Sequence, residues 1–356
     1  MRRPLFAFVL ISFFTNQLHG QGNTEKSIKL FEYKIDSIMS SNTIPGMAIA
    51  VSQNGRLIWS MGYGLADVEQ KVPVDPANTK FRIASISKAL TSIGLGILLE
   101  EKRIHLDSSI YFYLPDYPLQ KYRPTVRQLA SHTGGIRHYR GNENESTLPY
   151  ATVWEGLSIF SKDSLMYKPG TQFLYSSYGF NLLSAVMEKS SGINFLDFMK
   201  QRVLEPLNMN STLADHPDQI IPGRGRYYTR QGTNAPYVDN SYKWAGGGYV
   251  STATDLLKLG QAMIDGAIIK PETIHELITS QKLHNGKETG YGLGWFSGNG
   301  TSGRRWFGHS GGAVGGTSNL VIYPEQKLVV VILTNVSGAD IGGFTHQIAG
   351  AFLTKR

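Results

Sequence analysis

Ser85 and Lys88 form the one Ser-x-x-Lys sequence in this chain of 356 residues. Residues three apart lie on the same face of a helix, so the hydroxyl and the amine can meet. From Ala89 to Leu99 the only polar residues are Thr91 and Ser92, which predicts a helix that is buried on nearly all sides. A buried lysine loses solvation and its neutral form is favoured, so Lys88 could accept the proton of the Ser85 hydroxyl. The helix N-terminus would add backbone N–H groups and a partial positive charge beside a developing oxyanion.

The same two residues also admit a structural interpretation. Serine is a common N-cap, and a lysine stem can run along a helix until its ammonium group reaches water. A motif with two fixed positions is expected on the order of once by chance in a chain of this length. The spacing alone therefore leaves catalysis and helix capping open.

The chain resembles the serine beta-lactamase-like hydrolases, the superfamily of class C beta-lactamases and D-alanyl-D-alanine carboxypeptidases. The resemblance extends over essentially all of the chain after residue 20. Four segments occur in that family's order: Phe81–Lys88 (FRIASISK), Lys168–Ser177 (KPGTQFLYSS), Ala245–Leu256 (AGGGYVSTATDL) and His309–Gly312 (HSGG). Two less general segments resemble the mitochondrial serine beta-lactamase-like branch: Ser131–Tyr139 (SHTGGIRHY) and Pro236–Gly248 (PYVDNSYKWAGGG).

The resemblance implies a role for each matching residue. Ser85 would be the acylated nucleophile, and Lys88 would be its proton partner. Tyr175 matches the tyrosine of the family's Tyr-x-Asn motif, whose phenol oxygen passes protons to the leaving group. The N–H groups of Ser85 and Gly312 would form the oxyanion hole.

The other implied contacts with substrate depart from the usual pattern of the family. Ser177 stands where the Tyr-x-Asn motif has asparagine, so a hydroxyl must replace a substrate-facing amide. His309 and Gly311 match a Lys-Thr-Gly or His-x-Gly segment on the strand that edges the site. A histidine in place of lysine makes His309 only conditionally cationic near neutral pH. Both departures weaken the case for efficient beta-lactam hydrolysis and favour a peptidase or esterase.

A competing serine motif lies near the C-terminus. Residues Gly308–Gly312 fit Gly-x-Ser-x-Gly, the nucleophile elbow of α/β-hydrolases, with Asp340 and His346 downstream as partners. An elbow leads from a strand into a helix, whereas Ala313–Ser318 is glycine-rich and runs into another predicted strand. The context therefore disfavours Ser310 as the nucleophile.

The elements that must position these residues predict an α/β (α+β) fold. Strands are expected at Gly46–Gln53 and Arg56–Gly62, joined by Asn54-Gly55, and again at Tyr291–Ser297, Arg304–His309, Thr317–Tyr323 and Lys327–Asn335. The intervening pattern is mainly helical, with helices expected at Ser85–Lys102 and Phe180–Ser190 among others. We expect one antiparallel sheet built from both chain ends (about 24–80 and 286–356), flanked by helices, with an inserted helical lobe (about 85–280).

Composition limits the remaining possibilities. Cysteine is absent, which excludes disulfides, thiolate-bound zinc and a cysteine nucleophile. Neither a His-Glu-x-x-His motif nor a phosphate-binding loop occurs, so we expect no metal and no cofactor. The formal net charge is +8, but the basic residues do not cluster, so we expect no nucleic-acid partner.

The first 20 residues have the pattern of a secretory signal peptide. Arg2 and Arg3 precede an apolar run from Leu5 to Phe14, which is too short to span a bilayer. We expect residues 1–20 to be removed and residues 21–356 to form a single exported domain, periplasmic or secreted, without a stable membrane span. A mitochondrial transit peptide is the weaker alternative, since this run is not amphipathic.

These observations predict a serine hydrolase that forms an acyl-enzyme on an amide or ester substrate, either a small molecule or a peptide. Two other classes remain open. A penicillin-binding sensor would keep the nucleophile and release the acyl group very slowly. A filament-forming structural homologue would use the fold for assembly with little turnover, and a homo-oligomer is compatible with all three.

Overall fold

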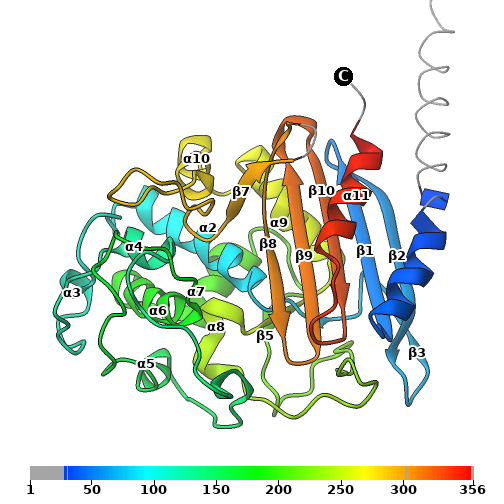
Figure 1. Cartoon of the computed structure of the whole chain (residues 1–356), viewed down its shortest axis with the longest axis horizontal. Coiled ribbons are helices and arrows are strands. Elements are labelled where there is room, and N and C mark those ends of the chain that lie inside the picture. The colour runs from blue at the N-terminus through cyan, green and yellow to red at the C-terminus, as the bar shows by residue number, and fades with distance from the viewer. Residues whose placement is uncertain (1–27, 30, 301–302, 354–356) are drawn as a thin grey trace, which may run out of the picture.

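The computed structural model describes residues 28–29, 31–300 and 303–353. The predicted signal peptide lies outside these residues. A sheet lies beside a helical lobe, and the two ends of the described chain lie together on the side of the sheet away from that lobe (Figure 1).

The main sheet is antiparallel and has the strand order β3-β2-β1-β10-β9-β8-β7. Its centre is the pairing of the first strand with the last, which places Met47 opposite Thr334 and Gln53 opposite Leu328. The predicted assembly of one sheet from both chain ends is therefore correct. The strands are β1 (Gly46–Gln53), β2 (Arg56–Asp67), β3 (Val72–Pro73), β7 (Phe296–Asn299), β8 (Arg305–Ala313), β9 (Gly316–Tyr323) and β10 (Leu328–Thr334).

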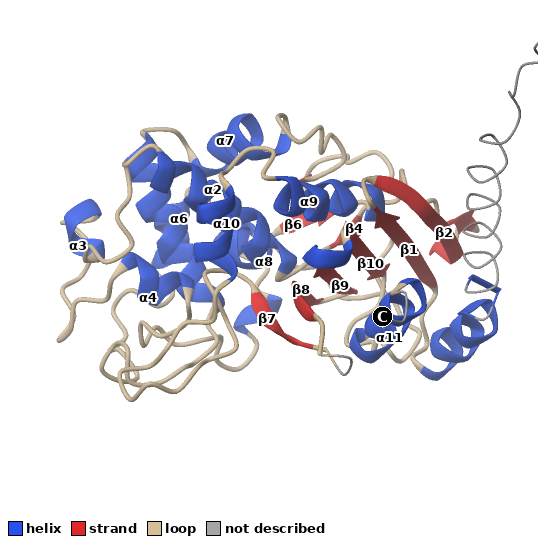
Figure 2. Cartoon of the chain, turned by 90° about the horizontal axis from the view of Figure 1, so that it is seen from above, coloured by secondary structure: helices blue, strands red, loops and turns tan. Residues whose placement is uncertain are grey.

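Helices cover both faces of this sheet. Because successive side chains of a strand point to opposite faces, each central strand contributes to two separate cores. Along β10, Val329 and Val331 belong to the core shared with the helical lobe, while Val330 and Ile332 belong to a second core on the other face. Helix α9 (Ala253–Asp265) covers the first face, and α11 (Gly342–Phe352) covers the second together with helical residues 31–41 (Figure 2). Burial on both faces explains why β10 is apolar throughout.

The helical lobe is built around α2 (Ile86–Glu100), whose residues from Ile86 to Leu98 are all buried. This confirms the expectation from its apolar sequence. A small sheet of order β4-β6-β5 joins the lobe to the start of α2. The other elements are β4 (Phe81–Arg82), β5 (Leu213–Ala214), β6 (Tyr249–Ser251), α3 (Ile110–Tyr113), α4 (Val126–Ala130), α5 (Val153–Leu157), α6 (Ser177–Ser191), α7 (Phe195–Met199), α8 (Trp244–Gly247) and α10 (Pro271–Ile278).

Two boundaries near the candidate residues differ from the sequence prediction. Strand β8 continues to Ala313 instead of ending at His309, because the pairing with β9 carries it through its glycines. Helix α6 begins at Ser177 instead of Phe180, capped by the Ser176 hydroxyl, which accepts from the N–H of Gly179. Both shifts place more of the candidate residues on regular elements.

Candidate active site

Ser85 lies at the N-terminus of α2, immediately after a strained residue. Ala84 has a φ of 47°, which is in the left-handed region that L-residues seldom adopt. The N–H groups of Ile86, Ser87 and Lys88 bond to carbonyls within the turn, whereas in the described part of the chain the Ser85 N–H donates no hydrogen bond. That N–H is therefore free to donate a hydrogen bond to a ligand.

Lys88 is fully buried, and its amine contacts three oxygens. The amine nitrogen lies 3.0 Å from Ser85 Oγ and 3.1 Å from Ser177 Oγ, and it also contacts the carbonyl of Gly246. Burial lowers the pKa of Lys88 well below its usual value, and the nearby charge of Lys243 lowers it further. A neutral amine can donate to the Gly246 carbonyl and to Ser177 while its lone pair faces the Ser85 hydroxyl. This is the arrangement that a general base requires.

Tyr175 approaches Ser85 from the other side. Its phenol interacts with the Ser85 side chain, which lowers the pKa of Tyr175 against the larger effect of burial, and the Lys88 nitrogen lies 4.8 Å from the centre of its ring. Burial raises the pKa of Tyr175, so its oxygen carries a proton at neutral pH. The Ser85 oxygen thus lies between an amine that can take a proton and a phenol that can relay one.

Strand β8 forms the wall opposite α2, and its glycines have different functions. A Cβ on Gly311 would lie 2.4 Å from the Ile83 carbonyl oxygen and 2.4 Å from Ser318 Oγ, so Gly311 allows β8 to approach the chain before Ser85. A Cβ on Gly312 would meet nothing within 4 Å. Gly312 lines the cavity beside Ser85, whereas Gly311 is buried under it. Gly311 therefore lies behind the cavity wall and does not line the cavity itself.

His309 is buried, and both of its ring nitrogens have partners. Nδ1 lies 2.6 Å from the carbonyl oxygen of Ser310, so it carries the proton, and Nε2 accepts from the Tyr291 hydroxyl at 2.9 Å. Burial, together with the charge of Lys88, lowers the pKa of His309 to about 3. The expectation of a conditionally cationic His309 near neutral pH is wrong, because the folded protein holds the ring neutral and away from water.

The competing elbow at Gly308–Gly312 lacks its structural context. Strand β8 turns directly into β9, so Ser310 lies on a strand of a β-hairpin and does not lead into a helix. The structure thus agrees with the sequence argument against Ser310.

The cavity at Ser85 contains a residue that the sequence analysis missed. It has a volume of about 210 Å³, and its lining includes Ser85, Ser177, Gly312 and the buried Lys243. Desolvation lowers the pKa of Lys243 to about 7, with the charge of Arg82 as the next cause. The Lys243 ammonium bonds to the Asn144 carbonyl at 3.2 Å. Lys243 belongs to the segment PYVDNSYKWAGGG, but nothing in that pattern shows that the fold buries its lysine beside Ser85.

The described residues contain neither a candidate metal site nor a helix suited to a membrane. Within residues 28–29, 31–300 and 303–353, no group of three or more His, Asp or Glu side chains could hold a metal ion. In the same part of the chain, no helix has the length and apolar character needed to cross a membrane.

The geometry agrees with a match to a known protein family. The family model described as beta-lactamase matches residues 31–346. The chain belongs to the beta-lactamase family. The human serine beta-lactamase-like protein LACTB, mitochondrial, is 33% identical, over 86% of this chain and 76% of the human protein. Penicillin-binding protein 4* of Bacillus subtilis (strain 168) is 27% identical, over 81% of this chain and 67% of that protein.

Solved structures share the fold. The octameric penicillin-binding protein homologue from Pyrococcus abyssi superposes with a TM-score of 0.79 at 27% identity, covering 91% of this chain and 76% of that one. A beta-lactamase/D-alanine carboxypeptidase from Pseudomonas syringae superposes with a TM-score of 0.77 at 20% identity, covering 92% and 98%. The predicted resemblance and the predicted fold class are confirmed.

Proposed function

We propose that this member of the beta-lactamase family is a serine hydrolase that cleaves an amide or ester through an acyl-enzyme. The observation that carries the proposal is the position of the buried Lys88 amine, 3.0 Å from the Ser85 oxygen and 4.8 Å from the centre of the Tyr175 ring. Lys88 accepts the Ser85 proton as the oxygen attacks the substrate carbonyl. The carbonyl oxygen becomes an oxyanion held by the N–H groups of Ser85 and Gly312. Tyr175 then relays the proton to the leaving group, and water hydrolyses the acyl-enzyme.

The test is covalent labelling with a fluorophosphonate probe, followed by peptide mapping. The label is expected on Ser85 in the unmodified protein and is expected to be lost in Ser85→Ala. A label on Ser310 would revive the elbow at Gly308–Gly312 and overturn the proposal. Ester substrates then separate a hydrolase from a penicillin-binding sensor, because a sensor releases one burst of product without further turnover.

The cavity beside Ser85 supports a preference for an anionic acyl group. Its lining includes Lys243 but neither Tyr175 nor His309. Because Tyr175 serves the leaving group, the acyl part of the substrate occupies the cavity on the other side of Ser85. A Lys243 ammonium bonded to a single carbonyl retains hydrogen-bond donors for a carboxylate in that cavity.

Two esters with the same leaving group test this preference. We expect 4-nitrophenyl hemisuccinate to exceed 4-nitrophenyl butyrate in kcat/KM by about tenfold or more, the value of one charged hydrogen bond. The preference should weaken as pH rises through about 7, because Lys243 loses its charge there. Lys243→Met should abolish it, while Lys243→Arg retains a cation. Equal preference in the unmodified protein and Lys243→Met would remove Lys243 from the substrate site.

We propose a single exported domain of residues 21–356, tested by N-terminal sequencing of the mature protein. We also propose that the protein forms a homo-oligomer, as the octameric homologue from Pyrococcus abyssi does. Sedimentation of Ser85→Ala measures the oligomeric state of a variant that cannot form the acyl-enzyme.

A further inference from the structure

Residues 131–139 (SHTGGIRHY) lie against the N-terminus of α6, the helix that follows Tyr175. The reaction described above leaves this segment without a role. The two histidine rings of residues 131–139 accept hydrogen bonds from the two backbone N–H groups that follow Tyr175, which we call the Tyr175 segment together with Leu174. The Ser176 N–H donates to His132 Nδ1 at 3.1 Å, and the Ser177 N–H donates to His138 Nδ1 at 3.3 Å.

Two further hydrogen bonds complete the attachment. The N–H of Leu174 donates to the backbone carbonyl of His132 at 2.9 Å. The hydroxyl of Ser176 donates to the carbonyl of Arg137 at 2.6 Å. The residues on both sides of Tyr175 are therefore fixed to a single segment.

The ring of His132 also contacts Tyr175 directly. The two ring centres are 4.3 Å apart, and the ring of His132 lies 4.6 Å from that of Tyr291 on another side. His132 is 3% exposed and has a φ of 60°, a conformation that a non-glycine residue adopts at a cost in energy. The fold therefore accepts backbone strain at the residue that holds the Tyr175 segment.

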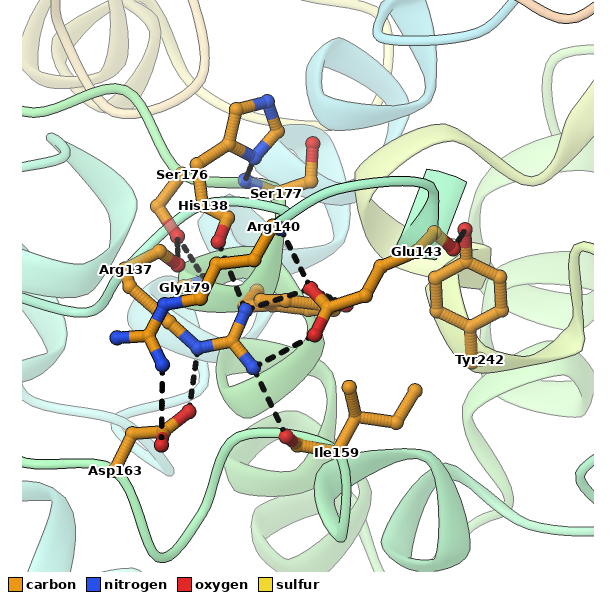
Figure 3. A network of polar contacts seen from close by, with 11 residues as sticks. Arg137, His138, Arg140, Glu143, Ile159, Asp163, Ser176, Ser177, Gly179 and Tyr242 are labelled. Carbon is orange, nitrogen blue, oxygen red and sulfur yellow. Dashed lines mark hydrogen bonds and ion pairs between the residues drawn. The ribbon is translucent and has the colours of Figure 1, made fainter. Parts of the chain in front are cut away.

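The segment itself is held by a buried arginine, as Figure 3 shows. The Arg137 guanidinium pairs with Glu143 at 2.7 Å and 3.0 Å and with Asp163, and it donates to the carbonyl of Ile159. Figure 3 also shows the His138 ring directed at the Ser177 N–H. A rigid support on one side thus carries the two histidine rings on the other.

We propose that His132 and His138 are positioning residues whose neutral rings, each accepting a backbone N–H at Nδ1, hold Tyr175 and Ser177 against Lys88 and Ser85. The inference rests on the proposed hydrolase function. It assigns to both rings the tautomer with the proton on Nε2, because a protonated Nδ1 cannot accept. His309 has the opposite tautomer, since its Nδ1 faces a carbonyl.

The surroundings of both rings favour the neutral form, and burial is the main cause. Burial lowers the pKa of His132 well below its usual value, and Lys88, His309 and His138 lower it further. Burial lowers the pKa of His138 to about 4, reinforced by Lys88 and Lys243 and opposed by Glu143. The tyrosines that face the rings, Tyr139, Tyr175 and Tyr291, all have raised pKa values and bring no negative charge at neutral pH.

Two kinds of variant test the role of each ring: one keeps a hydrogen-bond acceptor at the position of Nδ1, and the other removes it. Asparagine places an oxygen where His has Nδ1, and it also tolerates the left-handed backbone at position 132. Leucine removes the acceptor. With 4-nitrophenyl acetate as substrate, we expect His132→Leu and His138→Leu to lower kcat by about tenfold to a hundredfold, with KM within about threefold. The corresponding asparagine variants should recover to within a few-fold of the unmodified protein, and His105→Asn at the surface should change nothing.

The outcomes separate this inference from the proposed function. If Ser85 of the unmodified protein does not label with the fluorophosphonate, the proposed function fails. If Ser85 labels and the leucine variants turn over as fast as the unmodified protein, or if the asparagine variants are as slow as the leucine ones, the positioning role is overturned.

A measurement on the unmodified protein does not depend on any variant folding. Long-range ¹H–¹⁵N spectra at pH 7 should show the Nε2–H tautomer for His132 and His138 and the Nδ1–H tautomer for His309. An Nδ1–H tautomer at His132 or His138 would contradict the proposal.

Discussion

Lys88 is a cation-forming side chain whose nitrogen contacts no carboxylate in the described residues. Its contacts are two hydroxyls and a carbonyl, and the charge that acts on its pKa is that of another lysine, Lys243. Every one of these features favours the neutral amine, whose lone pair can accept a proton from Ser85.

The arginine variant tests this role at the residue scale. A guanidinium keeps its proton at every accessible pH, so Lys88→Arg should acylate at least a hundredfold more slowly, about the loss expected for a general base. In the unmodified protein, acylation should persist at neutral pH and fall in acid, where Lys88 gains its proton. Stopped-flow acylation by 4-nitrophenyl acetate from pH 5 to 10 measures both. A comparable rate in Lys88→Arg would mean that the base lies elsewhere, with Tyr175 the first suspect.

The sequence could predict the position and burial of residues that lie in one local pattern. It could not predict the burial of residues that only the tertiary fold places beside Ser85. Ser85 and Lys88 are one helical turn apart, and the apolar sequence after them already predicts burial. Lys243 lies 155 residues beyond Lys88 in a segment without periodicity, so its burial beside Ser85 could not be predicted. The neutral state of His309 depends on its burial, which no spacing rule indicates.

At the scale of elements, the backbone of β8 at Gly311 packs directly against the backbone of Ile83, which precedes α2. The predicted end of this strand at His309 was too early, because glycines usually indicate a turn. Here Gly311 lies within the paired part of β8, opposite Ser318, and a side chain would collide with the Ile83 carbonyl. Strand pairing outweighs the local preference of glycine for turns.

Adjacent glycines provide a matched pair of variants at this contact. Gly311→Ala should destabilise the fold by about 1–3 kcal/mol, the usual cost of forcing an extra methyl into a packed site. Gly312→Ala places its methyl in open space and should change stability by less than about 0.5 kcal/mol. Urea unfolding of the two variants measures the difference. Equal stability would show that β8 can move away from Ile83 at no cost.

For the whole molecule, the buried Lys88 lowers the free energy of unfolding at pH values where the unfolded chain carries its charge. The unfolded chain exposes a lysine that is charged below its usual pKa of about 10.4, whereas the folded protein has a lowered pKa and disfavours that charge. Protonation therefore favours the unfolded state, and the penalty grows as pH falls from about 10.4 until the folded pKa is reached.

Lys88→Met tests this cost because it removes the titration and keeps an apolar stem. The stability of Lys88→Met relative to the unmodified protein should increase by about 1.4 kcal/mol for each pH unit lowered within that window. The hydrogen bonds lost at Ser177 and Gly246 offset this by an amount that does not vary with pH. Urea unfolding at pH 8 and pH 10 gives the slope. A difference that does not change with pH would contradict a neutral Lys88.

The pairing of β1 with β10 also has a consequence for synthesis on the ribosome. The two strands are separated by 328 − 53 = 275 residues, so β1 emerges long before its partner exists. At roughly 5–20 residues per second, the delay is about 15–55 seconds. During that time the β1–β2 hairpin presents an apolar strand with an open edge, which is a template for aggregation. The unfinished chain is therefore open to aggregation along β1 until its last strand is made.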